Sequence, residues 1–149
     1  MSPSTTHEKF MKLALKQAQM AFDDGEIPVG AVIVHDGKVI GRGYNQVQKL
    51  NDPTAHAEML AITAACNGLG GKYLPNCTLY VTLEPCTMCA GAIKWAQIST
   101  IVFGAYDLKA GFSIFTDKLF AQKTTLLGGI LEKESKLLIL DFFEELRSK

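Results

Sequence analysis

The sequence shows no excess of either charge and contains little cysteine. Its 149 residues include 15 Lys and Arg against 15 Asp and Glu, so the formal net charge is zero. Non-specific coating of nucleic acid depends on many basic side chains that neutralise phosphates, so the sequence disfavours that class but not a local basic patch. The N-terminus has no apolar segment of a secretory signal. We therefore predict a cytoplasmic chain whose four cysteines are reduced and do not form a disulfide framework.

Long apolar runs are also missing. No run of about 18 apolar residues is free of charge, so we expect no transmembrane helix and no membrane partner. Hydrophobic residues make up 48% and charged residues 20% of the chain, an ordinary composition for a soluble protein. The length predicts one domain over residues 1–149, which can bury enough surface to fold without metal or disulfides.

The order of hydrophobic patterns predicts an α/β fold. Apolar residues recur with helical spacing over 7–24, and two β-branched strands within 29–45 meet at Asp36-Gly37, a strong hairpin signal. Helices that alternate with buried strands form a layered α/β sandwich. The remaining predicted elements are a helix from about 56 to the glycines at 68–71, a strand at 77–83, a helix at 86–97, a strand at 99–105, loops with a short helix over 106–123, a short strand at 126–131 and a C-terminal helix at 133–149.

Three side chains have the chemistry of metal ligands. Cys86 and Cys89 are three residues apart at the start of a predicted helix, so they share one helix face near an N-terminus that favours thiolates. His56 lies near the start of another predicted helix and is the natural third ligand. Helix N-termini gather at the carboxyl edge of parallel strands, which gives these residues a way to meet. One histidine and two cysteines favour zinc over other metals.

A carboxylate accompanies the three predicted ligands. Three protein ligands leave one tetrahedral position open, as in catalytic zinc sites, where bound water becomes far more acidic. Glu58 is suited to accept the proton of that water. Glu58 follows His56 by two residues, so the two side chains point to different sides of a regular helix. Both can face one site only if that site lies at the helix end.

Each of these features has a plainer explanation when it is taken alone. A Cys-x-x-Cys pair is often half of a structural zinc site or a redox pair, and a histidine at a helix start is often a cap. A glutamate in a first helical turn often only interacts with the helix dipole. A non-catalytic zinc module that binds RNA or protein is therefore one alternative, although such a module has no use for Glu58 beside the metal.

Two stretches together match a known signature. His56-Ala57-Glu58 and Pro85-Cys86-Thr87-Met88-Cys89 fit the pattern H-x-E…P-C-x-x-C of zinc-dependent nucleobase deaminases. Together with the surrounding sequence segments, such as IPVGAVIV, NDPTAHAEMLAI and LYVTLEPCTMCAGAI, this signature makes the chain resemble the cytidine deaminase-like superfamily over nearly its whole length. Within it, the chain is most similar to bacterial tRNA-specific adenosine deaminases. The resemblance implies a three-layer α/β/α sandwich with a five-stranded mixed sheet.

The resemblance also implies an activity and the residues that perform it. Zn²⁺ held by His56, Cys86 and Cys89 would activate a water that attacks C6 of the wobble adenosine in a tRNA anticodon loop, while Glu58 transfers protons and inosine forms. Members of the subfamily are usually homodimers. Positions that match substrate contacts in the family are Val29, Asn45, Ala57, Asp107 and Phe143.

Two segments depart from that subfamily. The sequence has Ala105-Tyr106-Asp107 where Ala-Arg-Asp is common, and the segment 119–125 is short and lacks an Asn-His stretch. Both lie where RNA contacts are expected. Together with the neutral net charge, they leave open a second function, the deamination of a free nucleobase or nucleoside such as guanine, cytosine or cytidine. Asp107 itself fits either a hydrogen bond to a ribose 2′-OH or a loop cap.

Overall fold

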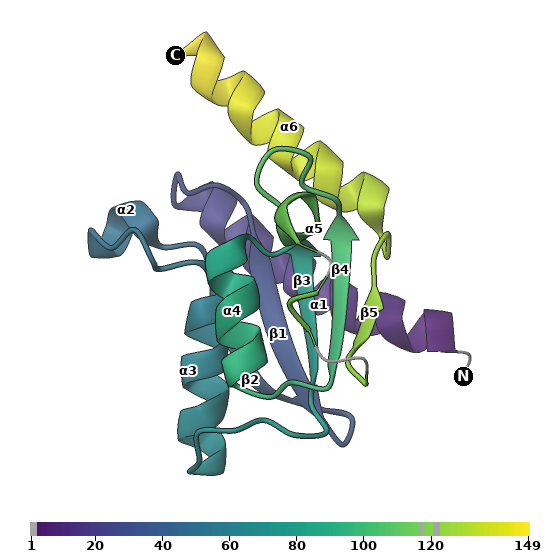
Figure 1. Ribbon diagram of the computed structural model, residues 1–149. Coiled ribbons are helices and arrows are strands. Elements are labelled where there is room, and N and C mark those ends of the chain that lie inside the picture. The colour runs from purple at the N-terminus through teal and green to yellow at the C-terminus, as the bar shows by residue number, and fades with distance from the viewer. Residues whose placement is uncertain (1–2, 117, 121–122) are drawn as a thin grey trace.

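The computed structural model describes residues 3–116, 118–120 and 123–149, and its centre is a mixed sheet with the strand order β2-β1-β3-β4-β5 (Figure 1). This arrangement confirms the predicted five-stranded mixed sheet. The elements along the chain are α1 (Pro3–Asp23), β1 (Gly30–His35), β2 (Lys38–Tyr44), α2 (Val47–Leu50), α3 (Ala57–Leu69), β3 (Thr78–Leu83), α4 (Thr87–Trp95), β4 (Thr100–Ala105), α5 (Phe112–Phe115), β5 (Thr125–Leu127) and α6 (Glu132–Ser148).

Helices cover both faces of the sheet, as the three-layer prediction requires (Figure 1). Successive side chains of a strand point to opposite faces. In β3, Leu79 and Val81 pack into the cluster beneath α3 and α4, whereas Tyr80 packs into the cluster beneath α1. The helix α6 joins α1 on that second face, where the rings of Phe22 and Phe142 meet edge to face with centroids 5.8 Å apart. The sheet thus separates two helical layers and two apolar cores.

Strand directions bring several helix starts to one edge. β3 and β4 are parallel, and β1 is antiparallel to both β2 and β3, so β2, β3 and β4 all run the same way. The chain leaves β2 toward α3 and leaves β3 toward α4. Because both strands end at the same edge of the sheet, α3 and α4 begin side by side there, as expected for the carboxyl edge of such strands.

The helix α3 lies unusually close to β2, and two glycines make this possible. A Cβ atom on Gly43 would collide with the Ala57 carbonyl oxygen, and one on Gly41 would collide with the Ala61 carbonyl oxygen. Larger residues at these positions would push the helix away from the sheet. The start of α3, and any side chain placed there, is therefore held at a fixed height above the sheet edge.

Some boundaries differ from the sequence predictions. The four-residue helix α2 was not predicted, and the strand expected at 126–131 ends at Leu127, because Gly128 packs against the Phe103 ring and Gly129 has a φ of +88°. The short helix expected within 106–123 is α5, although residues 117, 121 and 122 lie outside the described residues. Within the described ranges, no helix combines the length and apolar character needed to cross a membrane.

Candidate metal centre and active site

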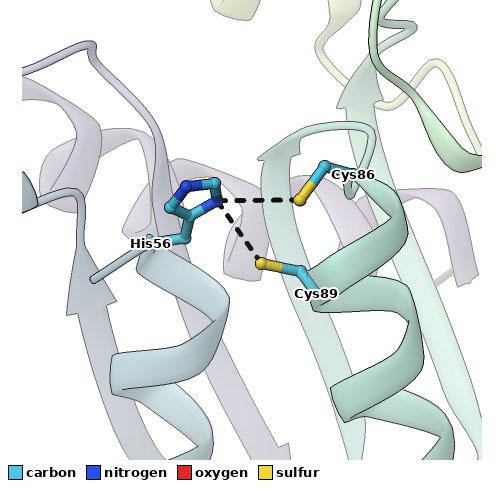
Figure 2. Close-up of side chains that lie close together, drawn as sticks. All are labelled: His56, Cys86 and Cys89. Carbon is cyan, nitrogen blue, oxygen red and sulfur yellow. Dashed lines mark hydrogen bonds between the residues drawn. The ribbon is translucent and has the colours of Figure 1, made fainter. Parts of the chain in front are cut away.

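His56, Cys86 and Cys89 meet at the common edge where α3 and α4 begin (Figure 2). The Nδ1 atom of His56 lies 3.7 Å from the Cys86 sulfur and 3.6 Å from the Cys89 sulfur. All three donor atoms lie within 4.8 Å of one another. The structure therefore brings together the three residues that the sequence predicted as ligands, although His56 lies 30 and 33 positions from the two cysteines in the chain.

The spacing of these donor atoms fits a zinc ion. Zinc bonds of about 2.3 Å to sulfur and about 2.05 Å to nitrogen, at a tetrahedral angle near 109°, place the nitrogen and each sulfur roughly 3.6 Å apart. The two observed separations of 3.7 and 3.6 Å match this value. One imidazole nitrogen and two thiolate sulfurs are also a donor set that favours zinc. The donor atoms of the three residues are therefore spaced to hold such an ion.

Two of the ligands occupy the cap positions of their helices. His56 is the N-cap of α3 with φ −79° and ψ 154°, and Cys86 is the N-cap of α4 with φ −72° and ψ 173°. An N-cap residue has extended backbone angles, so the direction of its side chain does not follow the periodicity of the helix. This explains how His56 and Glu58, two residues apart, serve one site. His56 precedes the helix, and Glu58 lies in its first turn.

The two thiols differ in acidity. Hydrogen bonds from Cys89 and His56 lower the pKa of Cys86 to about 4, against the opposing effect of burial. The hydrogen bond with Cys86 also raises the pKa of His56, and the same neighbour raises the pKa of Cys89. The pair therefore holds one thiolate beside one thiol. Metal ions bind thiolates, so the binding of zinc to this pair releases a proton.

Glu58 is a buried carboxyl group beside these ligands. Its side chain is 4% exposed, and burial raises its pKa to about 7, with a smaller contribution in the same direction from the Cys86 charge. A carboxyl group with a pKa near neutral is suited to take up and release protons at cellular pH. Among the described carboxyl groups with a shifted pKa, Glu58 is the one whose pKa is raised by burial, whereas the pKa of Asp52 is lowered.

The residues predicted to hold a base form a connected unit next to the cluster. The Asn45 side chain donates from Nδ2 to the Ile27 carbonyl oxygen at 3.0 Å and accepts at Oδ1 from the Ala57 N–H at 2.9 Å. Val29 is buried, and its carbonyl accepts the Asn45 backbone N–H at 3.1 Å. Asn45 thereby ties the chain before β1 to the start of α3. Contacts of Val29, Asn45 and Ala57 with a base stay predictions.

Asp107 caps the turn that follows β4. Its Oδ1 atom accepts hydrogen bonds from the backbone N–H groups of Lys109 and Ala110, both at 3.0 Å. The structure thus shows the loop-capping role that the sequence left as one of two options. The contact of Asp107 with a ribose hydroxyl stays a prediction.

Phe143 is not part of the cluster around the metal ligands. It lies on α6, in the helical layer on the opposite face of the sheet from α3 and α4, and its ring meets that of Phe142 with centroids 5.4 Å apart. The predicted contact between Phe143 and RNA stays a prediction.

One buried residue near the site was not singled out from the sequence. Glu84 is 3% exposed and directly precedes Pro85 and Cys86. The only signal in the sequence is its place between a buried strand and the Pro-Cys pair, and a glutamate in such a position has many possible roles. Its partners come from a segment more than 20 residues later, which the sequence alone does not place.

Comparison with known proteins agrees with this geometry. Residues 4–105 match the family described as the cytidine and deoxycytidylate deaminase zinc-binding region. A tRNA-specific adenosine deaminase of Aquifex aeolicus (strain VF5) is 46% identical over 146 residues, which cover 95% of this chain and 96% of that protein. A solved structure from a study of A-to-I editing by tRNA:A34 deaminases superposes with a TM-score of 0.81 at 44% identity, over 87% of this chain and 98% of the other.

A guanine deaminase from Nitrosomonas europaea is also similar in structure. Its TM-score is 0.82 at 25% sequence identity, over 95% of this chain and 84% of that chain. The fold is therefore shared by relatives that act on different purines, whereas sequence identity is higher toward the tRNA-specific enzymes. From the family match, the shared fold and the three-ligand cluster, we conclude that the chain belongs to the cytidine and deoxycytidylate deaminase family of zinc-dependent enzymes.

Proposed function

We propose that this protein is a zinc-dependent tRNA adenosine deaminase that converts the wobble adenosine to inosine. The observation that carries the proposal is the three-ligand cluster beside a buried Glu58, in a chain 46% identical over nearly its full length to a tRNA-specific adenosine deaminase. The substrate class is supported by the names of the similar proteins. The chemistry is supported by the geometry of the site.

His56, Cys86 and Cys89 are the residues that hold the ion. A zinc ion bound there supplies Lewis acidity, which makes water a good nucleophile near neutral pH. The position of the three ligands at two helix N-termini fixes where that water is activated. A substrate base must therefore place its reacting carbon at the open side of the cluster.

Glu58 moves the protons of the reaction. Its carboxylate takes one proton from the attacking water and delivers it to N1 of adenine as the C6–O bond forms. The remaining hydroxyl proton passes through the same carboxylate to the amino nitrogen, the C6–N bond breaks, and ammonia leaves. The product then has a carbonyl at C6 and a proton at N1, which is inosine. A pKa of about 7 lets one group act first as base and then as acid.

The remaining parts of the proposal concern how substrate and subunits are arranged. Val29, Asn45 and Ala57 border the base, and Asp107 and Phe143 contact the RNA. The chain works as a single domain in the cytoplasm, where its ligand thiols stay reduced. It forms a homodimer, and the 80% exposure of Trp95 on α4 supports this, because a large aromatic side chain gains most from burial by a partner.

The direct test is an assay with an anticodon stem-loop. Zinc-loaded protein should convert the wobble adenosine of a matching stem-loop to inosine, read by sequencing of the product. A stem-loop with guanosine at that position is the matched substrate control and should remain unchanged. Metal-replete protein that leaves the adenosine intact would reject the proposal.

A second candidate function is the deamination of a free purine such as guanine. The similarity to the guanine deaminase structure, with a TM-score of 0.82, favours it. The two functions are separated by ammonia release from a panel of guanine, cytosine, cytidine and adenosine. Turnover of one panel member, with no conversion of the stem-loop, would establish this second function in place of the first.

A further inference from the structure

Glu84 is a buried carboxylate that the proposed mechanism does not use. Its Oε1 atom accepts the Asp107 N–H at 3.1 Å, and its Oε2 atom accepts both the Ser113 N–H at 3.0 Å and the Ser113 hydroxyl. Hydrogen bonds to a carboxylate are about twice as strong as those between neutral groups. Glu84 therefore joins the segment 107–113, named here the 107–113 turn, to the residues that lead into Cys86.

The backbone joins the same two segments. The Phe112 N–H donates to the Pro85 carbonyl at 2.9 Å, and Cys86 forms an isolated antiparallel bridge with Gly111. Gly111 is packed so closely that a Cβ atom there would collide with the Glu84 carboxylate. The turn and the metal ligand Cys86 are therefore positioned by one set of contacts, with Glu84 at its centre.

Side chains exposed on the 107–113 turn and directly beside it suit a nucleic acid. Leu108 is 86% exposed, Phe115 is 65% exposed and Tyr106 is 48% exposed, and Lys109 is exposed between them. Exposed rings stack on unpaired bases, and a lysine beside them neutralises phosphate. A group of large apolar side chains exposed on a segment that is hydrogen-bonded to the Pro85–Cys86 backbone indicates a contact surface.

We propose that Glu84 is a positioning residue, which anchors the 107–113 turn against the Cys86 turn and so fixes the RNA-contacting surface relative to the metal. This inference rests on the proposed function. In the part of the chain that the structure describes, the Glu84 side chain is hydrogen-bonded to Asp107 and Ser113, so Glu84 acts through the turn. Its loss should therefore weaken the binding of RNA and leave the proton transfers of Glu58 unchanged.

The first test is Glu84→Gln in the full-length, zinc-loaded protein. The amide keeps the size of the side chain, but its NH₂ group must face one of the donors that the carboxylate accepted. We expect the KM for the anticodon stem-loop to rise about tenfold, with kcat within about twofold of wild type and an unchanged zinc content. Backbone hydrogen exchange of Asp107 or Ser113 should become faster, which reports the anchor directly.

A matched control is Glu26→Gln. Glu26 is also buried, at 2% exposure, and its carboxylate accepts the backbone N–H groups of Gln48 and Lys49 at 3.0 and 2.8 Å. The control loosens α2 by the same chemistry but leaves the 107–113 turn untouched. It should therefore not change the exchange of the Asp107 and Ser113 amides. Faster exchange at those amides in both variants would show a general loss of stability and overturn the inference.

A second variant displaces the carboxylate without removing it. Gly111→Ala places a Cβ atom against the Glu84 carboxylate and the Asp107 carbonyl oxygen, so it should separate Glu84 from the turn and reproduce the rise in KM and the faster exchange. Unchanged KM and exchange in both variants would overturn the anchor, and so would a loss of kcat and zinc content in parallel with the rise in KM. If the wild-type protein fails to deaminate the stem-loop, the proposed function is rejected, while hydrogen exchange in Glu84→Gln still decides whether Glu84 holds the turn.

Discussion

Two glutamates, Glu58 and Glu84, are buried to the same degree yet surrounded by different partners. Glu58 is 4% exposed and Glu84 is 3% exposed, and neither takes part in an ion pair within the described ranges. Both oxygens of Glu84 accept donors from the 107–113 turn. Glu58 instead faces the metal ligands, and burial raises its pKa to about 7. Glu84, whose oxygens accept donors of a distant turn, holds structure, whereas Glu58, whose hydrogen bonds come from its own backbone and the Cys89 thiol, is available for proton transfer beside the ligands.

The largest expected effect comes from removal of the metal, which should affect the role of Glu58 and leave the role of Glu84 unchanged. Treatment with a strong chelator should abolish deamination, because Glu58 has no activated water to work with. The amides of Asp107 and Ser113 should stay protected, because Glu84 does not depend on the metal. Elemental analysis, turnover and hydrogen exchange on one sample check this, and activity should return with added Zn²⁺. Deprotection of the two amides on chelation beyond that of amides elsewhere in the fold would contradict the separation.

Next in size is the substitution Glu58→Gln. General acid–base groups contribute about 10²- to 10⁴-fold to rate, and Glu58 acts in more than one proton transfer, so we expect kcat to fall at least ~10³-fold. Zinc content should not change, since the three ligands are intact. Glu84→Gln is the matched comparison, in which kcat stays close to wild type. A Glu58→Gln protein with substantial turnover would assign proton transfer to another group.

A smaller effect is expected on the free energy of unfolding, and here Glu84→Gln should have the larger effect of the two variants. Glu84→Gln should lower the free energy of unfolding by about 2 kcal/mol, because donors inside the protein lose a charged acceptor. Glu58→Gln should change it by less than about 1 kcal/mol and toward greater stability, because it removes a carboxylate that burial disfavours. Urea unfolding of the zinc-loaded proteins measures both values. A larger loss of stability in Glu58→Gln than in Glu84→Gln would contradict the assignment of the structural role to Glu84.

The smallest expected effect is a difference in stability between alanine variants of two serines. Ser113→Ala removes one of the donors to Glu84 and should lower the free energy of unfolding by about 1 kcal/mol. Ser135 is buried against Gly104, and its hydroxyl has no hydrogen-bond partner among the described atoms. Ser135→Ala should therefore be neutral or slightly stabilising. Equal destabilisation of the two variants would mean that the bond between Ser113 and Glu84 adds nothing.

The sequence predicted the parts of this molecule that depend on local patterns. The helix and strand periods predicted most elements, and the signature around His56 and Cys86 predicted the cluster of ligands. The sequence did not predict α2, since a four-residue helix has no periodicity and is held by the distant carboxylate of Glu26. It also missed the anchoring contacts of Glu84, because they join residues 23 to 29 positions apart. Such contacts depend on the folded chain and not on any local pattern.

The placement of His56 and Cys86 at the starts of two separate helices has a further consequence for the unfolded chain. The two residues are 30 positions apart. A metal that bridges them closes a loop of that length. By analogy with a disulfide, the chain entropy lost through a cross-link of this span raises the free energy of the unfolded chain by roughly 3–4 kcal/mol at room temperature. The catalytic ion would then serve as a reversible cross-link in a chain whose four cysteines form no disulfide. Loss of zinc would shorten the lifetime of the protein as well as stop its chemistry.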